Sequence, residues 1–194
     1  MKALALFRDD YSKSIHVREI ARQVGVDPST ILSQLQKLVS LNVLTYSLVP
    51  RGRNKEYRLN LENLSTKYCM VEAEANLTLN FLQGNYLIKK ILSELDRDLD
   101  GIVILFGSYA RGAATAKSDV DILVITSTKI NERLIEEEER IVGKDISVQR
   151  ASRSRFLDGL RGNEPLMKEV VGNHILLKGI DDFCDVLWHY HGGH

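Results

Sequence analysis

Residues 107–121 read Gly-Ser-Tyr-Ala-Arg-Gly-Ala-Ala-Thr-Ala-Lys-Ser-Asp-Val-Asp. An apolar run at 102–106 precedes the Gly-Ser pair, and a second apolar run at 122–125 follows the aspartates. Gly107 lets the backbone come close to a ligand, and the Ser108 hydroxyl and nearby backbone N–H groups at a helix start can hold a phosphate. The stretch therefore predicts a phosphate-holding turn between two strands.

The two aspartates of this stretch predict a cation site. Asp119 and Asp121 are expected on a strand, where alternate side chains point the same way. Two adjacent carboxylates repel each other unless a cation lies between them, and Mg²⁺ favours carboxylate and phosphate oxygens. Asp145 opens a further strand and can reach the same cation if the two strands pair. The other interpretation of Asp145 is a surface turn residue.

The order of elements predicts the fold class of the second part of the chain. From residue 86 onward the pattern alternates between helices and strands, and the apolar runs are continuous, which is typical of covered strands in an α/β arrangement. The expected elements are a helix up to residue 95, a strand at 102–106, a helix at about 109–115, a strand at 119–126, a helix at 131–142 and a strand at 144–149.

Gly107-Ser108, ten residues, Asp119-Val120-Asp121 and a following strand acid resemble the DNA polymerase β-like nucleotidyltransferase superfamily. The similarity covers about residues 86–194, and Tyr109-Ala110-Arg111-Gly112 is also similar to the minimal branch of that superfamily. The resemblance implies two divalent cations, Mg²⁺ or Mn²⁺, and a nucleoside triphosphate substrate, with ATP the first choice. It further implies these roles: Asp119 and Asp121 as metal ligands, Asp145 as a third ligand that helps to activate the attacking hydroxyl, and Gly107, Ser108, Arg111 and Ser118 as nucleotide-binding residues. Arg111 has an equal alternative, a pair with an acidic neighbour.

The first sixty residues predict a helix-turn-helix. Helical spacing at 16–24 is followed by Gly25, which suits a tight turn, and then by Asp27-Pro28, which suits the start of a second helix. Apolar stretches at 43–46 and 57–59 predict a β-hairpin with a basic tip. Together these elements resemble a winged helix-turn-helix.

This resemblance predicts a DNA-binding module, with a winged-helix fold used for protein contacts as the alternative. Residues 1–60 hold ten Lys or Arg against five Asp or Glu, although the whole chain has a net charge of zero. The residues expected to meet base edges or phosphates are Ser29, Thr30, Ser33, Gln34, Lys37, Arg51, Arg53 and Lys55.

The expected organisation is a two-domain protein of the α+β or α/β class. Residues 1–62 form the winged helix-turn-helix, residues 63–84 a linker or dimer helix, and residues 85–194 a nucleotidyltransferase fold with a mixed sheet flanked by helices. We expect a cytoplasmic protein, because the sequence has only two cysteines and lacks a convincing signal peptide or membrane span. The glutamate run at 136–139 is interpreted as a solvated helix face, and the histidine-containing C-terminus as frayed.

Three functions follow from these expectations. The first is a metal-dependent nucleotidyltransferase that moves a nucleoside monophosphate to a hydroxyl and carries a DNA-binding module. The second is a transcriptional regulator whose second domain senses a nucleotide without catalysis. The third rests on the resemblance only: an antitoxin-type nucleotidyltransferase that modifies a HEPN-domain toxin partner. A homodimer is a further possibility, and no membrane partner is expected.

Overall fold

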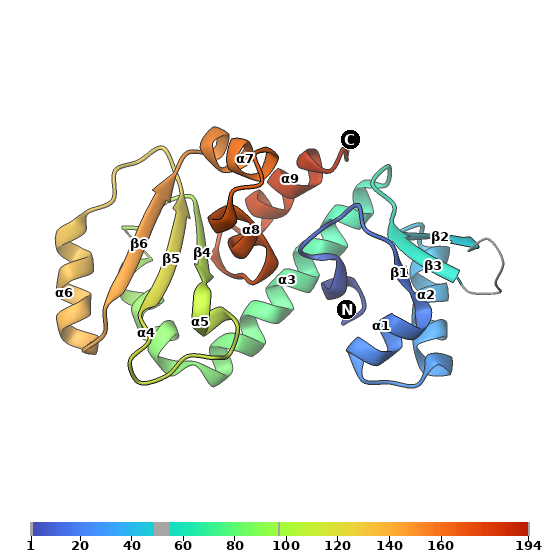
Figure 1. The fold of residues 1–194 in the computed structure, drawn as a ribbon, viewed down its shortest axis with the longest axis horizontal. Coiled ribbons are helices and arrows are strands. Elements are labelled where there is room, and N and C mark those ends of the chain that lie inside the picture. The colour runs from blue at the N-terminus through green and yellow to red at the C-terminus, as the bar shows by residue number, and fades with distance from the viewer. Residues whose placement is uncertain (1, 49–54, 97, 194) are drawn as a thin grey trace. The chain divides into compact units, whose positions relative to one another are not determined.

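The computed structural model describes residues 2–48, 55–96 and 98–193 and groups the chain into two compact units (Figure 1). The first unit consists of Met1–Glu74 together with Phe183–His194, and the second of Ala75–Asp182. The C-terminal residues thus group with the first unit by their contacts. The expected domain limits, 1–62, 63–84 and 85–194, stay a prediction.

Two consecutive helices form where the first unit was expected to hold a helix-turn-helix. They are α1 (Val17–Val24) and α2 (Pro28–Ser40), with Asp27 at the N-cap position of α2. Gly25 ends α1 in the left-handed conformation, with φ of 76°, which a residue without a side chain adopts at little cost. Ile20 and Ala21 of α1 and Ile31 and Leu35 of α2 are buried. The apolar spacing therefore identified the buried faces of both helices.

The first unit also contains a three-stranded antiparallel sheet. Its strands are β1 (Ile15–His16), β2 (Leu44–Leu48) and β3 (Lys55–Leu59), in the order β1-β3-β2. The tip between β2 and β3, including Arg51 and Arg53, lies outside the described residues. A short 3-10 helix, η1 (Leu4–Phe7), precedes the sheet. The winged helix-turn-helix assignment itself stays a prediction.

The end of the chain belongs to the packed part of the first unit. In α9 (Ile180–Tyr190) the side chain of Trp188 is buried, and the Gly193 N–H donates to the Trp188 carbonyl at 2.9 Å. His191 stacks on Tyr11, with ring centroids 5.7 Å apart, and its Nδ1 lies 3.4 Å from Asp10 Oδ1. The expectation of a frayed C-terminus is wrong for residues 188–193, because ring stacking and burial hold them.

The second unit contains a four-stranded mixed sheet with helices between the strands. After α3 (Leu64–Gly84), whose last residues belong here, come α4 (Tyr86–Leu95), β4 (Ile102–Phe106), α5 (Gly107–Ala110), β5 (Val120–Ile125), α6 (Glu132–Val142), β6 (Ile146–Ala151), α7 (Arg153–Arg161), α8 (Pro165–Gly172) and β7 (Ile175–Lys178). The strand order is β6-β5-β4-β7, and Figure 1 shows the first three side by side. β5 and β6 are parallel, and the other pairs are antiparallel. The mixed sheet agrees with the expectation.

One face of this sheet carries the main core of the second unit. Ile88, Ile91 and Leu95 of α4 and Ile135 of α6 pack with buried side chains of β4, β5 and β6. All five residues of β4 are buried, as its continuous apolar run predicted. α8 contacts β4 as well. Among the described residues, no helix has both the length and the apolar content that crossing a membrane requires.

Two expectations about this unit need correction. The helix expected at 109–115 covers only Gly107–Ala110, because the chain turns at Gly112, which has a positive φ of 67°. The run at 136–139 is also not uniformly solvated. Glu138 is 3% exposed, and burial raises the pKa of its carboxyl above the ordinary value. It lies on α6, which packs against α4.

Candidate active site

The backbone of Gly107 lies directly against the carboxylate of Asp121. β4 and β5 pair so that Phe106 is opposite Asp121, and Gly107 follows at the start of α5. Gly107 has a φ of +68°, and a Cβ at this position would collide with Asp121 Oδ2 and lie 3.1 Å from its Cγ. Only glycine fits both the conformation and the space. The predicted turn and one predicted metal ligand therefore meet at the end of β4.

Asp119 and Asp121 stand at the start of β5. Asp119 comes just before the strand and is exposed, while Asp121 is its second residue and is half-buried. Burial first, and then the charges of Asp119 and Glu169, raise the pKa of Asp121, whereas Arg111 lowers it. The two aspartates are thus close enough to repel each other, as the sequence predicted. This is the electrostatic situation that a bound cation would relieve.

Arg111 pairs with an acid that the sequence did not indicate. Its Nη1 donates to Glu169 Oε1 of α8, 58 positions further along the chain. The two side chains are 42% and 41% exposed. The acidic-neighbour alternative for Arg111 is therefore the arrangement in this structure. Glu169 does not belong to a recognisable sequence motif. The packing of α8 against β4 brings it to the site, so the local sequence offers no signal for it.

Ser118 closes the loop between α5 and β5. Its Oγ accepts a hydrogen bond from the Thr115 N–H at 2.9 Å, and its own N–H donates to the Thr115 carbonyl at 3.1 Å. Lys144 holds the same loop by donating to the Ala116 carbonyl. The structure thus gives Ser118 a turn-forming role, and its predicted contact with a nucleotide stays a prediction.

Asp145 lies beside Asp119 by strand register. Val120 pairs with Ile146 in the parallel ladder, so positions 119 and 145 both come one residue earlier, and the Val120 N–H donates to the Asp145 carbonyl at 2.9 Å. The Asp145 side chain is exposed. Within the described ranges, no three His, Cys, Asp or Glu side chains are grouped closely enough to hold a metal ion. Asp145 as a third ligand stays a prediction.

The predicted DNA-contact residues of α2 share one exposed surface. The exposed side chains are those of Ser29, Thr30, Ser33, Gln34 and Lys37. Lys55, at the start of β3, is half-buried and places its Nζ 4.1 Å from the centre of the Tyr46 ring. Of the predicted set, therefore, the α2 residues are accessible to a ligand, and Lys55 is partly engaged by an aromatic ring.

Residues 86–161 match the family model described as a nucleotidyltransferase domain. The match begins with α4 and ends with α7, so it contains the Gly107 turn, both aspartates and Asp145. It covers less than half of the chain and supports nucleotidyl transfer as the general class of activity. This finding confirms the nucleotidyltransferase part of the resemblance.

The other comparisons add little. No curated protein matches the chain. One solved structure, described as a crystal structure of a toxin-antitoxin with AMP-PNP, is similar at 20% sequence identity with a TM-score of 0.40. The similarity covers 53% of this chain and 82% of that one.

Proposed function

We propose that the second unit is a metal-dependent enzyme that transfers a nucleoside monophosphate from a nucleoside triphosphate, ATP in the first instance, to a hydroxyl and releases pyrophosphate. The observation that carries this proposal is the close approach of the Gly107 backbone to the Asp121 carboxylate, within a stretch that matches a nucleotidyltransferase domain. A phosphate held at Gly107 and Ser108 would lie next to the carboxylates that bind a cation.

The donor set fits a hard divalent cation. Asp119 and Asp121 offer carboxylate oxygens, the ligands that Mg²⁺ prefers in combination with substrate phosphates. The pKa of Asp121 is raised, which means that its negative charge is poorly stabilised, and a bound cation would stabilise that charge. Asp145, next to Asp119 in the register, is the proposed third ligand. Bound Mg²⁺ or Mn²⁺ would lower the pKa of the attacking hydroxyl and neutralise charge on the transferred phosphorus.

The chain's own residues would position the triphosphate. The N–H groups of the first turn of α5 have no partners within the helix and so can donate to phosphate oxygens. Arg111 would exchange its partner Glu169 for a phosphate oxygen, since a guanidinium binds either anion with charge-assisted hydrogen bonds. Asp145 would accept the proton of the attacking hydroxyl.

We further propose that the first unit binds DNA through α2. Support comes from the exposed side chains of Gln34 and Lys37 on that helix and from the positive charge of residues 1–60. Gln34 is suited to base edges and Lys37 to phosphates. Arg51, Arg53 and Lys55 would add phosphate contacts from the hairpin.

The test of the enzyme is incubation with each labelled nucleoside triphosphate and Mg²⁺ or Mn²⁺, alone and with cell extract. Asp119→Asn with Asp121→Asn should abolish transfer, while Asp98→Asn, which removes an exposed carboxylate from the α4–β4 loop, should leave it unchanged. Full transfer by the double variant would overturn the assignment. Binding of the triphosphate by the wild type without any transfer would favour the nucleotide-sensing regulator. Label on a partner protein would favour the toxin-modifying alternative.

A further inference from the structure

The strand β6 presents an open edge. It is the outermost strand of its sheet and, among the described residues, pairs with β5 alone. The Asp145 and Ala151 carbonyls accept bonds from Val120 and Thr126, so the odd-numbered residues direct their backbone groups toward β5. Backbone direction alternates along a strand, and the even-numbered residues of β6 therefore point outward. Such an edge is a template for another strand.

Two side-chain contacts distinguish the edges of this sheet. At the first residue of the open edge, Glu139 accepts the Ile146 N–H at 2.7 Å. At the opposite edge, Thr78 of α3 donates to the Leu176 carbonyl of β7 at 2.9 Å. The outward backbone groups that remain in the middle of β6 are those of Val148 and Arg150.

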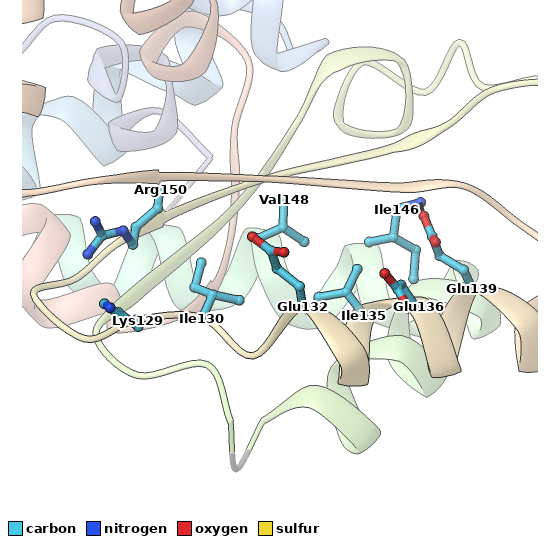
Figure 2. Close-up of a pocket in the computed structure, with 9 residues that line it drawn as sticks. All are labelled: Lys129, Ile130, Glu132, Ile135, Glu136, Glu139, Ile146, Val148 and Arg150. Atoms are coloured by element: carbon cyan, nitrogen blue, oxygen red, sulfur yellow. Dashed lines mark hydrogen bonds between the residues drawn. The ribbon is translucent and has the colours of Figure 1, made fainter.

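A groove of about 570 Å³ runs beside these groups between β6 and α6 (Figure 2). Its apolar lining consists of Ile130, Ile135, Ile146 and Val148. Figure 2 shows Lys129 and Arg150 at one end and the carboxylates of Glu132, Glu136 and Glu139 along α6 toward the other end. The groove is therefore polarised, positive at the C-terminal end of β6 and negative toward its N-terminal end.

We propose that the occupant of this edge is a second copy of the chain, whose β6 pairs antiparallel with the first β6. The pairing extends each sheet into its neighbour around a twofold axis at Gln149. Val148 of each copy exchanges backbone hydrogen bonds with Arg150 of the other, which uses the outward groups and leaves Ile146 with Glu139. A twofold interface needs a surface that is complementary to itself.

The charge distribution supplies this self-complementarity. Antiparallel pairing brings the positive end of one β6 toward the negative end of the other, whereas parallel pairing would align like charges. In the proposed register, Arg150 of the second copy lies beside Val148 of the first. Glu132 and Val148 line the same groove, so the Arg150 of the second copy enters the groove that holds the Glu132 of the first, and we pair these two charges. In the single chain, Arg150 is exposed and makes one long bond of 3.4 Å to the Thr128 carbonyl.

The register can be tested with a cysteine at the twofold axis. Gln149 would face Gln149 of the other copy in a non-hydrogen-bonded pair, where Cα atoms lie about 4.5 Å apart and a disulfide fits. In the full chain with Cys69→Ser, Gln149→Cys should form a covalent dimer under mild oxidation. The control Ser147→Cys, exposed on the same strand, should not, because it would face residue 151. Equal cross-linking of both variants, or of neither, would overturn the register.

The interface itself can be tested by exchanging its charges. In sedimentation experiments we expect the wild type to have about twice the 22.0 kDa mass of one chain. Arg150→Glu and Glu132→Arg should each raise the dimer dissociation constant at least tenfold. Mixing these two variants should restore dimers, because in the heterodimer the two substituted side chains face each other with opposite charges and the second pair stays native. A monomeric wild type, a dimer unaffected by either charge reversal, or a mixture that stays monomeric would each overturn the proposal.

Discussion

Gly107 leaves the space that the Asp121 carboxylate fills. A Cβ at position 107 would lie 3.1 Å from Asp121 Cγ and still closer to one of its oxygens, and the φ of +68° independently disfavours a side chain there. The turn and the acid can be this close only because β4 and β5 are antiparallel neighbours with Phe106 opposite Asp121.

The first prediction uses this contact. Gly107→Ala should lower the free energy of unfolding by more than the roughly 1–2 kcal/mol of left-handed strain, because the methyl group also displaces Asp121. It should abolish nucleotidyl transfer. Gly112→Ala is the matched control, since Gly112 has a φ of +67° and no described atom within 4 Å of the added Cβ. Chemical denaturation and the transfer assay would check both variants, and equal losses in the two would contradict the argument.

The second prediction concerns Asp121 and pH. Its pKa is raised by burial and then by Asp119 and Glu169, so the folded state holds this proton more tightly than the unfolded chain. The stabilisation by the proton is present at low pH and is lost as the pH rises through the raised pKa. Without divalent cations, Asp121→Asn should therefore raise the melting temperature at neutral pH, and the gain should shrink in acid.

A divalent cation should reverse the order of the two melting temperatures, so that the wild type becomes more stable than Asp121→Asn. A ligand at one hundred times its dissociation constant stabilises the state that binds it by about 2.7 kcal/mol. Mg²⁺ should thus raise the melting temperature of the wild type but not that of Asp121→Asn. Thermal unfolding with EDTA and with a Mg²⁺ titration measures both effects. An equal response to Mg²⁺ in the two proteins would remove Asp121 from the proposed metal site.

The third prediction separates the roles of Arg111 and Glu169. The pair is about two-fifths exposed, so breaking it should change stability by less than about 1 kcal/mol. Arg111→Gln should weaken triphosphate binding about tenfold, and Glu169→Gln should strengthen it several-fold by releasing Arg111 and removing a negative charge near Asp121. Calorimetric titration with a non-hydrolysable analogue measures these affinities.

The control for this pair is another exposed ion pair of the same unit. Arg155 and Glu164 contact each other through two hydrogen bonds at 2.9 Å and 2.7 Å. Arg155→Gln should leave nucleotide affinity unchanged. If it weakened binding as much as Arg111→Gln does, a general loss of positive charge would explain both results.

The fourth prediction concerns DNA. Lys37→Ala should reduce the slope of log affinity against log salt by about one and weaken binding to all sequences alike. Gln34→Ala should instead cost about 1–3 kcal/mol on a preferred site and relax its sequence preference. Lys89→Ala is the control, because it removes an exposed positive charge from α4, outside the first unit. Sites selected from random DNA, followed by titrations at several salt concentrations, would test all three.

Local sequence predicted the elements that have strong periodicity or turn residues. The spacing around Ile20 and Ile31 located two helices, Gly25 located the turn between them, and the apolar runs located β4 and β5. The limits were less accurate where a short segment depends on its surroundings. The helix after Gly107 ends at Ala110, because the chain turns at Gly112, and the loop that follows is held by Lys144, a residue outside any local window.

The site was predictable only where its residues share a motif. Gly107, Asp119 and Asp121 lie within fifteen positions, at the end of β4 and the start of β5, so the pairing of these two neighbouring strands brings them near each other. Glu169 reaches the same place through the packing of α8, and the burial of Glu138 depends on the contact between α6 and α4. Such contacts between distant segments leave no trace in a local pattern.

The C-terminal stretch has a consequence for synthesis. The first unit includes Phe183–His194, and the buried Trp188 and the stacked His191 lie in that stretch. A nascent chain that has emerged only as far as Glu74 therefore lacks part of this unit. The continuous segment Ala75–Asp182 can fold on the ribosome before the unit that begins the chain is complete. We accordingly expect a stalled fragment of residues 1–74 to be more sensitive to protease than the same residues in the released protein.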